Sequence, residues 1–416
     1  IAHVAVYLWR LRSYPLGRGE PGGDAADFVS ARRHAQGDWS VHPLGCDAPL
    51  FTQASAEADP PGRLQALALH ADADRLRRGV QVPAPRFLTG DDPVLRVFVR
   101  LVGNPAILEV PRDAMFACRL PQPRPGEPLP ALAMAADPER GRVGFADGLP
   151  GDAVWTQHSY GFSGDLGGGP YDRNAALRTL GRALAGSAAA VGEPVFDAPD
   201  VWQAGVSHLL ADDGQGRLFP SLRDAVAAWN ALPAGRTGVI VIMDSVSEHD
   251  APGAPALPLE IRIGERSRLL IVAGRWPREP QEGEGSATGM GEADAGASLV
   301  RRAGTVDASG VRAHLIGDVR VQGTAPAGTS DGGACVINGL LLEGRLDVAA
   351  GNLGQLVLSH CSVVTGVDGV AAPSALVVQP GGNAQLVLRI ERSICPAVAV
   401  ADPIRTVSVI DSLIGG

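Results

Sequence analysis

One glycine-rich loop in this chain could hold a phosphate or a metal ion. Gly164-Asp165-Leu166-Gly167-Gly168-Gly169 offers backbone N–H groups of the kind that cradle phosphates. The loop does not fit the GxxxxGK[ST] pattern, and the chain contains no lysine to supply its cation. Asp165 and Asp172 could bind calcium, but two carboxylates fall short of a calcium ligand series. We therefore predict a structural turn here and no cofactor.

Nucleophile and metal motifs give no assignment either. Ser163 lies in Gly161-Phe162-Ser163-Gly164, where the second glycine comes one position too early for a nucleophile elbow. His249, between Glu248 and Asp250, could be a metal ligand, but a solvated charged turn is the favoured interpretation. The five cysteines are widely scattered and form no CxxC: Cys46, Cys118, Cys335, Cys361 and Cys395. We therefore predict no catalytic, cofactor-binding or metal-binding residue.

A polar column near the end of the chain is the last candidate for chemistry. Enzymes that hydrolyse polysaccharides need two carboxylates at a set separation. The expected column is Asn338, Cys361, Arg392 and Asp411, with a single acid, and we expect Arg392 and Asp411 to pair across adjacent coils for roughly 0.2 to 1 kcal/mol. The other coil acids are too few to define a site: Asp318, Glu343, Asp347 and Glu391. We therefore lean toward a non-enzymatic protein. An enzyme is not excluded, because some lyases use arginine as the base.

These residues belong to a repeat that predicts the fold of the C-terminal half. A small residue followed by an aliphatic one recurs in four segments: Ile337-Asn338-Gly339-Leu340, His360-Cys361-Ser362-Val363, Glu391-Arg392-Ser393-Ile394 and Ile410-Asp411-Ser412-Leu413. The aliphatic runs between them are too short for helices and are typical of strands. A repeat of roughly 20 residues then indicates a solenoid. We expect Gly339, Ser362, Ser393 and Ser412 to form one column at a corner of the coils.

The predicted fold class is mainly β. We expect a mixed, mostly β N-terminal domain over residues 1–195, a linker over 196–220, and a right-handed parallel β-helix over 221–416 that is capped by a short helix. The cap is predicted at Ser221 to Leu232, with Ser221 as N-cap. Further helices are predicted at Arg63 to Arg78 and Asn174 to Ala185, and a mobile loop at Pro277 to Ser298. Strands are predicted at Val4 to Leu8, Arg96 to Val102, Ile107 to Val110, Gly238 to Met243, Leu259 to Ile263, Leu269 to Val272 and within His314 to Gly323.

Composition limits the partners. Of 416 residues, 45% are hydrophobic but only 5% aromatic, so the core must be aliphatic. A net charge of −9 argues against a nucleic-acid partner, and no apolar run approaches the roughly 20 residues of a membrane span. Scattered cysteines and the absence of a signal peptide favour synthesis in the cytoplasm. The chain begins with Ile1 and stops within the repeats, so we expect a fragment whose open end is covered by a further segment or a partner.

Several stretches resemble one group of proteins. They are Tyr160 to Arg173, Leu340 to Gly344, Asn352 to Cys361, Val6 to Leu11 and Pro43 to Phe51. Together they resemble large, uncharacterised bacterial proteins encoded beside phage-tail-like genes, including those of contractile injection particles. The resemblance implies a structural or accessory part of a tail-like assembly, with a right-handed β-helix in the C-terminal half, and it carries no catalytic residues.

Two functions follow as hypotheses. The first is a non-enzymatic structural or interaction component of a phage-tail-like (contractile injection) assembly, with other tail or baseplate-like proteins as partners, in a particle that can act outside the cell. The alternative is a carbohydrate-binding or polysaccharide-cleaving β-helix protein, argued from architecture alone, with a surface glycan as partner. Residues 314–416 contain no Trp, Tyr or Phe, which disfavours sugar stacking within these coils.

Overall fold

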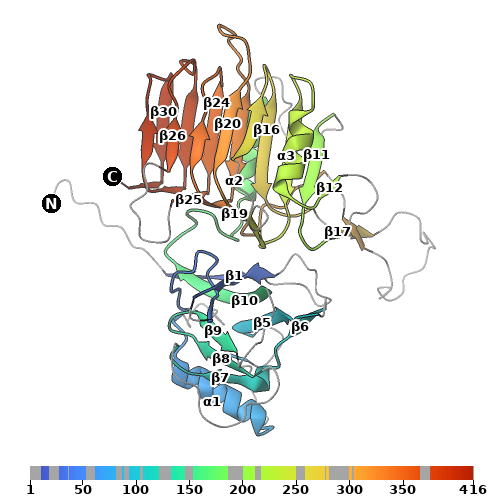
Figure 1. Cartoon of the computed structure of the whole chain (residues 1–416), viewed down its shortest axis with the longest axis vertical. Helices are drawn as coiled ribbons and strands as arrows, with labels where there is room; N and C mark the ends of the chain where they lie inside the picture. The colour runs from blue at the N-terminus through green and yellow to red at the C-terminus, as the bar shows by residue number, and fades with distance from the viewer. Residues whose placement is uncertain are drawn as a thin grey trace, which may run out of the picture.

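A computed structural model describes most of the chain, and the structural statements below concern the described residues. These are residues 11–17, 28–35, 37–52, 61–80, 87–88, 93–103, 106–120, 133–145, 153–185, 200–210, 217–249, 258–276, 278–280, 299–301, 304–365 and 375–415. The chain is mainly β and has two parts, an N-terminal part of two sheets and a C-terminal stack of parallel strands (Figure 1). The strand predicted at Val4 to Leu8 lies outside the described residues.

The N-terminal part contains two sheets and one helix. The first sheet runs β1 (Arg12–Leu16), β10 (Ala153–Phe162), β5 (Leu95–Arg100) and β6 (Ile107–Glu109), all antiparallel, with β2 (Val29–Ser30) also on β10. The second runs β3 (Arg32–Arg33), β4 (Trp39–Ser40), β9 (Arg142–Phe145), β8 (Met134–Asp137) and β7 (Met115–Ala117). α1 (Ala66–Arg77) and the short 3₁₀ turn η2 (Arg112–Ala114) contact each other, and α1 also contacts β7. Side chains from both sheets, among them Val97 and Val143, share one apolar core.

The C-terminal part contains three parallel sheets. The eight-stranded sheet runs β12 (Leu218–Phe219), β11 (Trp202–Val206), β13 (Thr237–Ile242), β16 (Arg268–Ala273), β21 (Ala334–Asn338), β24 (Gln355–Ser359), β27 (Val387–Glu391) and β30 (Thr406–Ile410). The six-stranded sheet runs β14 (Ser247–His249), β19 (His314–Ile316), β22 (Leu341–Glu343), β25 (Ser362–Val364), β28 (Ile394–Cys395) and β31 (Leu413–Ile414). The five-stranded sheet runs β15 (Leu259–Ile263), β20 (Val319–Gly323), β23 (Leu346–Val348), β26 (Leu376–Val378) and β29 (Val398–Val400).

Each turn of the chain gives one strand to each of these sheets, so the part is a β-helix-like stack of coils. β21, β22 and β23 form one coil, and they pair in parallel with β24, β25 and β26 of the next. This confirms the predicted solenoid of parallel strands.

The coil interior is built from aliphatic ladders. Ile271, Ile337, Leu358 and Ile390 are register partners in successive strands of the eight-stranded sheet, and all are buried. Each fully buried side chain of this size contributes roughly 1.5 to 3 kcal/mol. The low aromatic content of the sequence therefore suits this core, because aliphatic side chains can repeat at one position from coil to coil.

Two helices cover the coils. α3 (Leu222–Asn230) contacts the early strands β11, β12, β13 and β15, and its Leu222, Val226 and Trp229 are buried in the coil core. Ser221 accepts a hydrogen bond from the Asp224 N–H at 3.1 Å, which confirms the predicted N-cap. α2 (Asn174–Ala185) instead packs Leu177 on the outer face of the eight-stranded sheet. α3 and β30 lie at opposite ends of the stack (Figure 1).

The corner between the eight- and six-stranded sheets differs from the predicted column. Gly339, His360, Arg392 and Asp411 occupy equivalent positions there, and all have positive φ. One left-handed residue thus turns the chain at each of these four coils, and three of the four are not glycine. Ile242 and Ala273, the equivalent residues of the two coils before them, do not have positive φ.

Of the four residues in the predicted column, only two are aligned. Ser412 Oγ accepts a hydrogen bond from Ser393 N at 3.1 Å, and Ser393 Oγ accepts one from Cys361 N at 3.0 Å. Gly339 lies one position before this column and Ser362 one after it, as the strand registers show. The column with Gly339 and Ser362 was therefore wrong. The aligned column holds Leu340, Cys361, Ser393 and Ser412, and the serine hydroxyls of the last two coils each bond the preceding coil.

Two further segments differ from the expected loops. β11 and β12 lie within the stretch expected to be a linker, where β11 pairs in parallel with β13, so the eight-stranded sheet begins before Ser221. β17 (Arg278–Pro280) lies in the loop expected at Pro277 to Ser298 and pairs antiparallel with β18 (Leu299–Arg301). Residues 281–298 of that loop lie outside the described residues.

Candidate functional site

The glycine-rich loop docks the N-terminal part onto the coils. Gly167 N donates to Arg392 O at 2.8 Å, and Gly168 N donates to Ser362 Oγ at 3.0 Å. The N–H groups that could have held a phosphate therefore bond to the six-stranded sheet and to the corner before it. A Cβ on Gly168 would lie 2.6 Å from the Leu340 carbonyl carbon, so only glycine allows this approach.

The two aspartates of this segment do not converge on one ion. Asp165 Oδ1 accepts from Tyr14 Oη at 2.7 Å, whereas Asp172 Oδ1 accepts from Asn174 N at 2.8 Å, just where α2 begins. Among the described residues, no group of three or more His, Cys, Asp or Glu side chains could hold a metal ion. The two carboxylates thus serve separate local contacts.

Arg173 anchors the same segment inside the molecule. Its guanidinium is fully buried and donates to Asn338 Oδ1 at 3.1 Å and to carbonyl oxygens of Gly169, Tyr171 and Ala273. These carbonyl and amide oxygens take the place of a counterion. Burial lowers the pKa of Arg173. The arginine has a structural role at this junction.

Tyr171 and His360 continue this anchor. Tyr171 Oη lies 2.9 Å from His360 Nδ1, and its hydroxyl also donates to Gly167 O. Burial, followed by the charge of Arg173, lowers the pKa of His360 to about 4, so the imidazole is neutral at pH 7. This contact holds a non-glycine residue at a corner with positive φ, where a side chain is ordinarily strained.

A second polar contact joins the two parts at the six-stranded sheet. Arg32 Nη1 donates to both carboxylate oxygens of Glu343, at 2.7 and 2.6 Å. His314 Nε2 lies 3.4 Å from the same carboxylate, and His314 Nδ1 lies 2.7 Å from Ser247 Oγ. Burial raises the pKa of Glu343, but the bonds from His314 and Arg32 outweigh it, so the pKa lies below its ordinary value.

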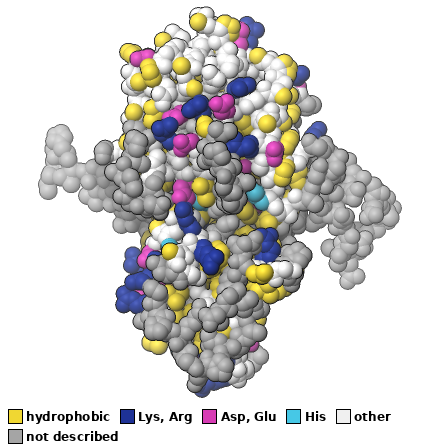
Figure 2. All heavy atoms as spheres, in the orientation of Figure 1, with side chains coloured by type: hydrophobic (Ala, Val, Ile, Leu, Met, Phe, Trp, Pro, Cys, Tyr) yellow, Lys and Arg dark blue, Asp and Glu magenta, His cyan; other side chains and the backbone are white. Residues whose placement is uncertain are grey.

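The remaining coil acids are also engaged. Asp347 pairs with Arg345 at 2.9 Å, Glu391 pairs with Arg389, and Asp318 accepts from the Arg345 N–H at 2.8 Å. Figure 2 shows basic and acidic side chains interspersed on this face of the coils. These acids therefore do not form the facing carboxylates that glycoside hydrolysis needs.

The pair expected across the last two coils is present, but the predicted polar column is wrong: Asn338 lies one position before Arg392 and Asp411 in the register, and Cys361 one position after. Arg392 Nε lies 3.9 Å from Asp411 Oδ2, and both side chains are more than half exposed. His249 lies in β14, but its side chain is outside the described part of the structure.

An Asp–His–Glu chain near the cap was not predicted. His208 Nδ1 lies 3.1 Å from Oδ1 of the fully buried Asp244, and His208 Nε2 lies 3.9 Å from Glu248 Oε2. Burial lowers the pKa of His208, but Asp244 and Glu248 outweigh it and raise the pKa. Glu248 also accepts from Leu222 N at 2.6 Å, so the chain ties the first coils to the N-terminus of α3. The sequence signal that could have indicated this chain is that His208 and Asp244 each come two residues after a strand, β11 and β13 respectively.

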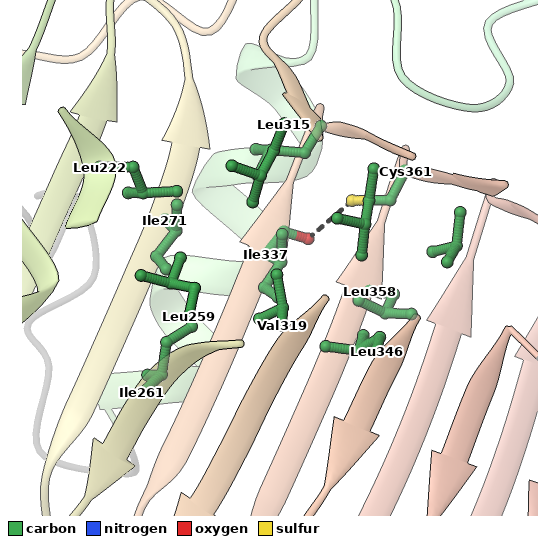
Figure 3. Close-up of a pocket in the computed structure, with 13 residues that line it drawn as sticks. Leu222, Leu259, Ile261, Ile271, Leu315, Val319, Ile337, Leu346, Leu358 and Cys361 are labelled. Atoms are coloured by element: carbon green, nitrogen blue, oxygen red, sulfur yellow. Dashed lines mark hydrogen bonds between the residues drawn. The ribbon is translucent and has the colours of Figure 1, made fainter. Parts of the chain in front are cut away.

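The cavity inside the stack is apolar. Its volume is about 20 Å³, and it is lined by aliphatic side chains and Cys361, whose Sγ lies 3.3 Å from Ile337 O (Figure 3). A space of this size holds at most one water, and its walls offer almost no polar partner. It is a packing gap in the coil core and cannot host polar chemistry.

The last coil leaves apolar side chains exposed. Val407 and Val409 continue the interior ladders of the eight-stranded sheet after Leu388 and Ile390, but they are 47% and 49% exposed. Val400 and Ile414 end the ladders of the other two sheets and are more than a third exposed. The equivalent side chains of the preceding coil are buried in the core, whereas these side chains are exposed to solvent.

Comparison of this chain with known proteins identified no similar protein. No protein-family model, curated protein or solved structure matches this chain. Among the described residues, no helix is both long and apolar enough to cross a membrane.

Proposed function

We propose that this chain is a non-enzymatic structural or interaction component of a phage-tail-like (contractile injection) assembly, built on a right-handed parallel β-helix. The sequence resemblance in Tyr160 to Arg173 and in the coils supports this assignment. The single structural observation that supports this role is the stack of parallel coils, with the N-terminal part bound at one corner of it through the glycine-rich loop. α3 covers the first coils, while the last coil exposes the ends of its interior ladders.

The exposed coil is suited to a partner that adds strands. β29, β30 and β31 each pair on one side only among the described strands. An edge with free N–H and C=O groups accepts an extended segment of another protein, and the adjoining aliphatic side chains supply its apolar contacts. Each aliphatic side chain that such a segment buries completely contributes up to roughly 1.5 to 3 kcal/mol. Where no further coil of the same chain covers this edge, the occupant we propose is a strand of another assembly protein.

Affinity purification tests this proposal. The tagged chain and its Val409→Asp variant are purified from lysates of the producing cells, and co-purifying proteins are identified by mass spectrometry. Val102→Asp is the matched control, because Val102 is 83% exposed on the N-terminal part. We expect sheath, tube or baseplate proteins with the unmodified chain and the control, and their loss with Val409→Asp. A chain that never co-purifies with such proteins would contradict the proposal.

The carbohydrate alternative lacks comparable support. Residues 314–416 contain no aromatic side chain, and Asp318, Glu343, Asp347 and Glu391 pair with arginines or backbone. A glycan-array screen combined with an assay for new reducing ends tests this alternative directly. Binding of one glycan class, or release of reducing ends, would favour it over the assembly role.

A further inference from the structure

Arg312 is a buried cation at the junction between the two parts. It is 3% exposed, and its guanidinium carbon lies 5.7 Å from the ring centroid of Tyr160. Its backbone N–H donates to Ser245 Oγ at 3.0 Å. Its Nε and Nη2 atoms are buried and have no hydrogen-bond acceptor among the described residues. A buried charge that lacks both a counterion and hydrogen bonds is strongly destabilising, so these N–H groups need an acceptor.

Arg312 supplies the positive charge of this part of the junction, and three histidines lie within reach of that charge. Burial, and then the charge of Arg312, lowers the pKa of both His42 and His158. Burial also lowers the pKa of His314, where Glu343 opposes the shift and Arg312 adds to it. Glu343, the carboxylate that acts on His314, is already bound by Arg32 and His314. Among the described residues, no carboxylate is recorded as a partner of the Arg312 guanidinium.

Arg173 is a buried arginine whose guanidinium nitrogen atoms all have hydrogen-bond acceptors, and it serves as a comparison for Arg312. Its three nitrogen atoms donate to one amide oxygen and three carbonyl oxygens. Arg312 is equally buried but has no such set of oxygens. The difference indicates that the acceptor at Arg312 comes from outside the described chain.

We propose that Arg312, together with His42 and His158, forms a binding site for a small inorganic oxyanion, phosphate or sulfate, that bridges the two parts of the chain. A guanidinium presents paired N–H groups that match two oxygens of a tetrahedral oxyanion. His42 Nδ1 accepts from Leu44 N at 3.2 Å, so its proton resides on Nε2, which can donate to the anion. Because Arg312 belongs to the coils and both histidines to the N-terminal part, the bound anion would link them.

Thermal unfolding with added phosphate tests the site in the whole chain. Ionic strength is held constant with sodium gluconate, a bulkier anion, and the probes are inorganic phosphate, sulfate and chloride. An anion that binds only the folded state raises Tm with its concentration, by about 3 °C or more near saturation. We expect this rise with phosphate or sulfate for the unmodified chain and for Arg320→Gln, a control at an exposed coil arginine. We expect no rise for Arg312→Gln.

Three outcomes would overturn the proposal: no Tm change with either oxyanion, an equal rise for Arg312→Gln, or an equal effect of chloride. Since Arg312→Gln could fail to fold, calorimetric titration of the unmodified chain with phosphate is the second measurement. Saturable binding of one phosphate per chain, weakened at least several-fold in His42→Gln, supports the site. Absence of saturable binding overturns it.

Discussion

Replacement of Gly168 by alanine should separate the docking loop from the coils. The added Cβ would lie 2.6 Å from both the carbonyl carbon and the oxygen of Leu340, and 2.8 Å from Leu341 N. That backbone is held in the sheet, because Leu341 N donates to Ala313 O at 2.9 Å and Leu340 O accepts from Ser362 N at 2.9 Å. The loop must therefore retreat by about 0.8 Å to restore ordinary contact.

This retreat removes two hydrogen bonds between the parts. Gly168 N would lose Ser362 Oγ, now at 3.0 Å, and Gly167 N would lose Arg392 O, now at 2.8 Å. An N–H group left unpaired at such a contact costs about 1 to 3 kcal/mol, so for the two groups we expect a total loss of about 2 to 6 kcal/mol of unfolding free energy.

Urea unfolding followed by circular dichroism measures this loss. The matched control is Gly62→Ala, because a Cβ at Gly62 would meet no atom within 4 Å and its φ is not positive. We expect the control to stay within about 0.5 kcal/mol of the unmodified chain. If Gly168→Ala were as stable as the control, the close approach of loop and coil would be refuted.

Three further outcomes are expected. Leu358→Ala should lower the unfolding free energy in urea by about 2 to 5 kcal/mol, because Leu358 is buried in the coil ladder. The control Leu67→Ala, at a 78% exposed position, should lower it by under about 0.5 kcal/mol. Equal losses would contradict the stacked interior. Burial beside a guanidinium lowers the pKa of His158 to about 3, while the unfolded chain binds this proton near pH 6.5. The contribution of His158 to the unfolding free energy is therefore complete above about pH 6.5 and declines as pH falls toward 3, by up to about 1.4 kcal/mol per pH unit. Urea unfolding across this range should show a smaller dependence of the unfolding free energy on pH in His158→Gln. An unchanged dependence on pH would count against the burial of His158. Asp411→Asn removes an exposed pair with Arg392 and should cost at most about 1 kcal/mol by thermal unfolding, and a larger loss would show that the pair does more than bridge the surface.

Local periodicity carried much of the fold prediction. The helix at Asn174 to Ala185 and the strand at Leu259 to Ile263 have the predicted bounds, and the cap helix begins after Ser221 as expected. Short aliphatic runs separated by corners were sufficient to predict parallel coils, because a repeating core needs equivalent residues at equivalent positions.

The register could not be obtained from residue size. In the last four coils the corner uses one left-handed residue, which small or flexible residues ordinarily provide. Here His360, Arg392 and Asp411 occupy that position, so the small residues did not mark it. Contacts in the folded chain, such as that between His360 and Tyr171, stabilise this backbone and leave no local signal.

The junction was also beyond sequence reasoning. β10 is the longest of the described strands, yet its polar residues Thr156, His158 and Ser159 are buried. It therefore lacks the alternation of a half-exposed strand. His42, His158 and Arg312 are far apart in the sequence and come together only through the packing of one part on the other. No local pattern can reveal such a cluster.

Distances between spin labels test most directly whether the coils stack in sequence toward the exposed end. Glu260, Val377 and Ala399 lie in one column of the five-stranded sheet, three and four strands apart. With exposed Cys46 and half-buried Cys118 replaced by serine, labels at 260 and 377 should be about 14 Å apart, and labels at 260 and 399 about 19 Å apart, at about 4.8 Å per coil. A pair at 260 and 399 that is no farther apart than the pair at 260 and 377 would contradict the stack, and with it the scaffold on which the proposed assembly role depends.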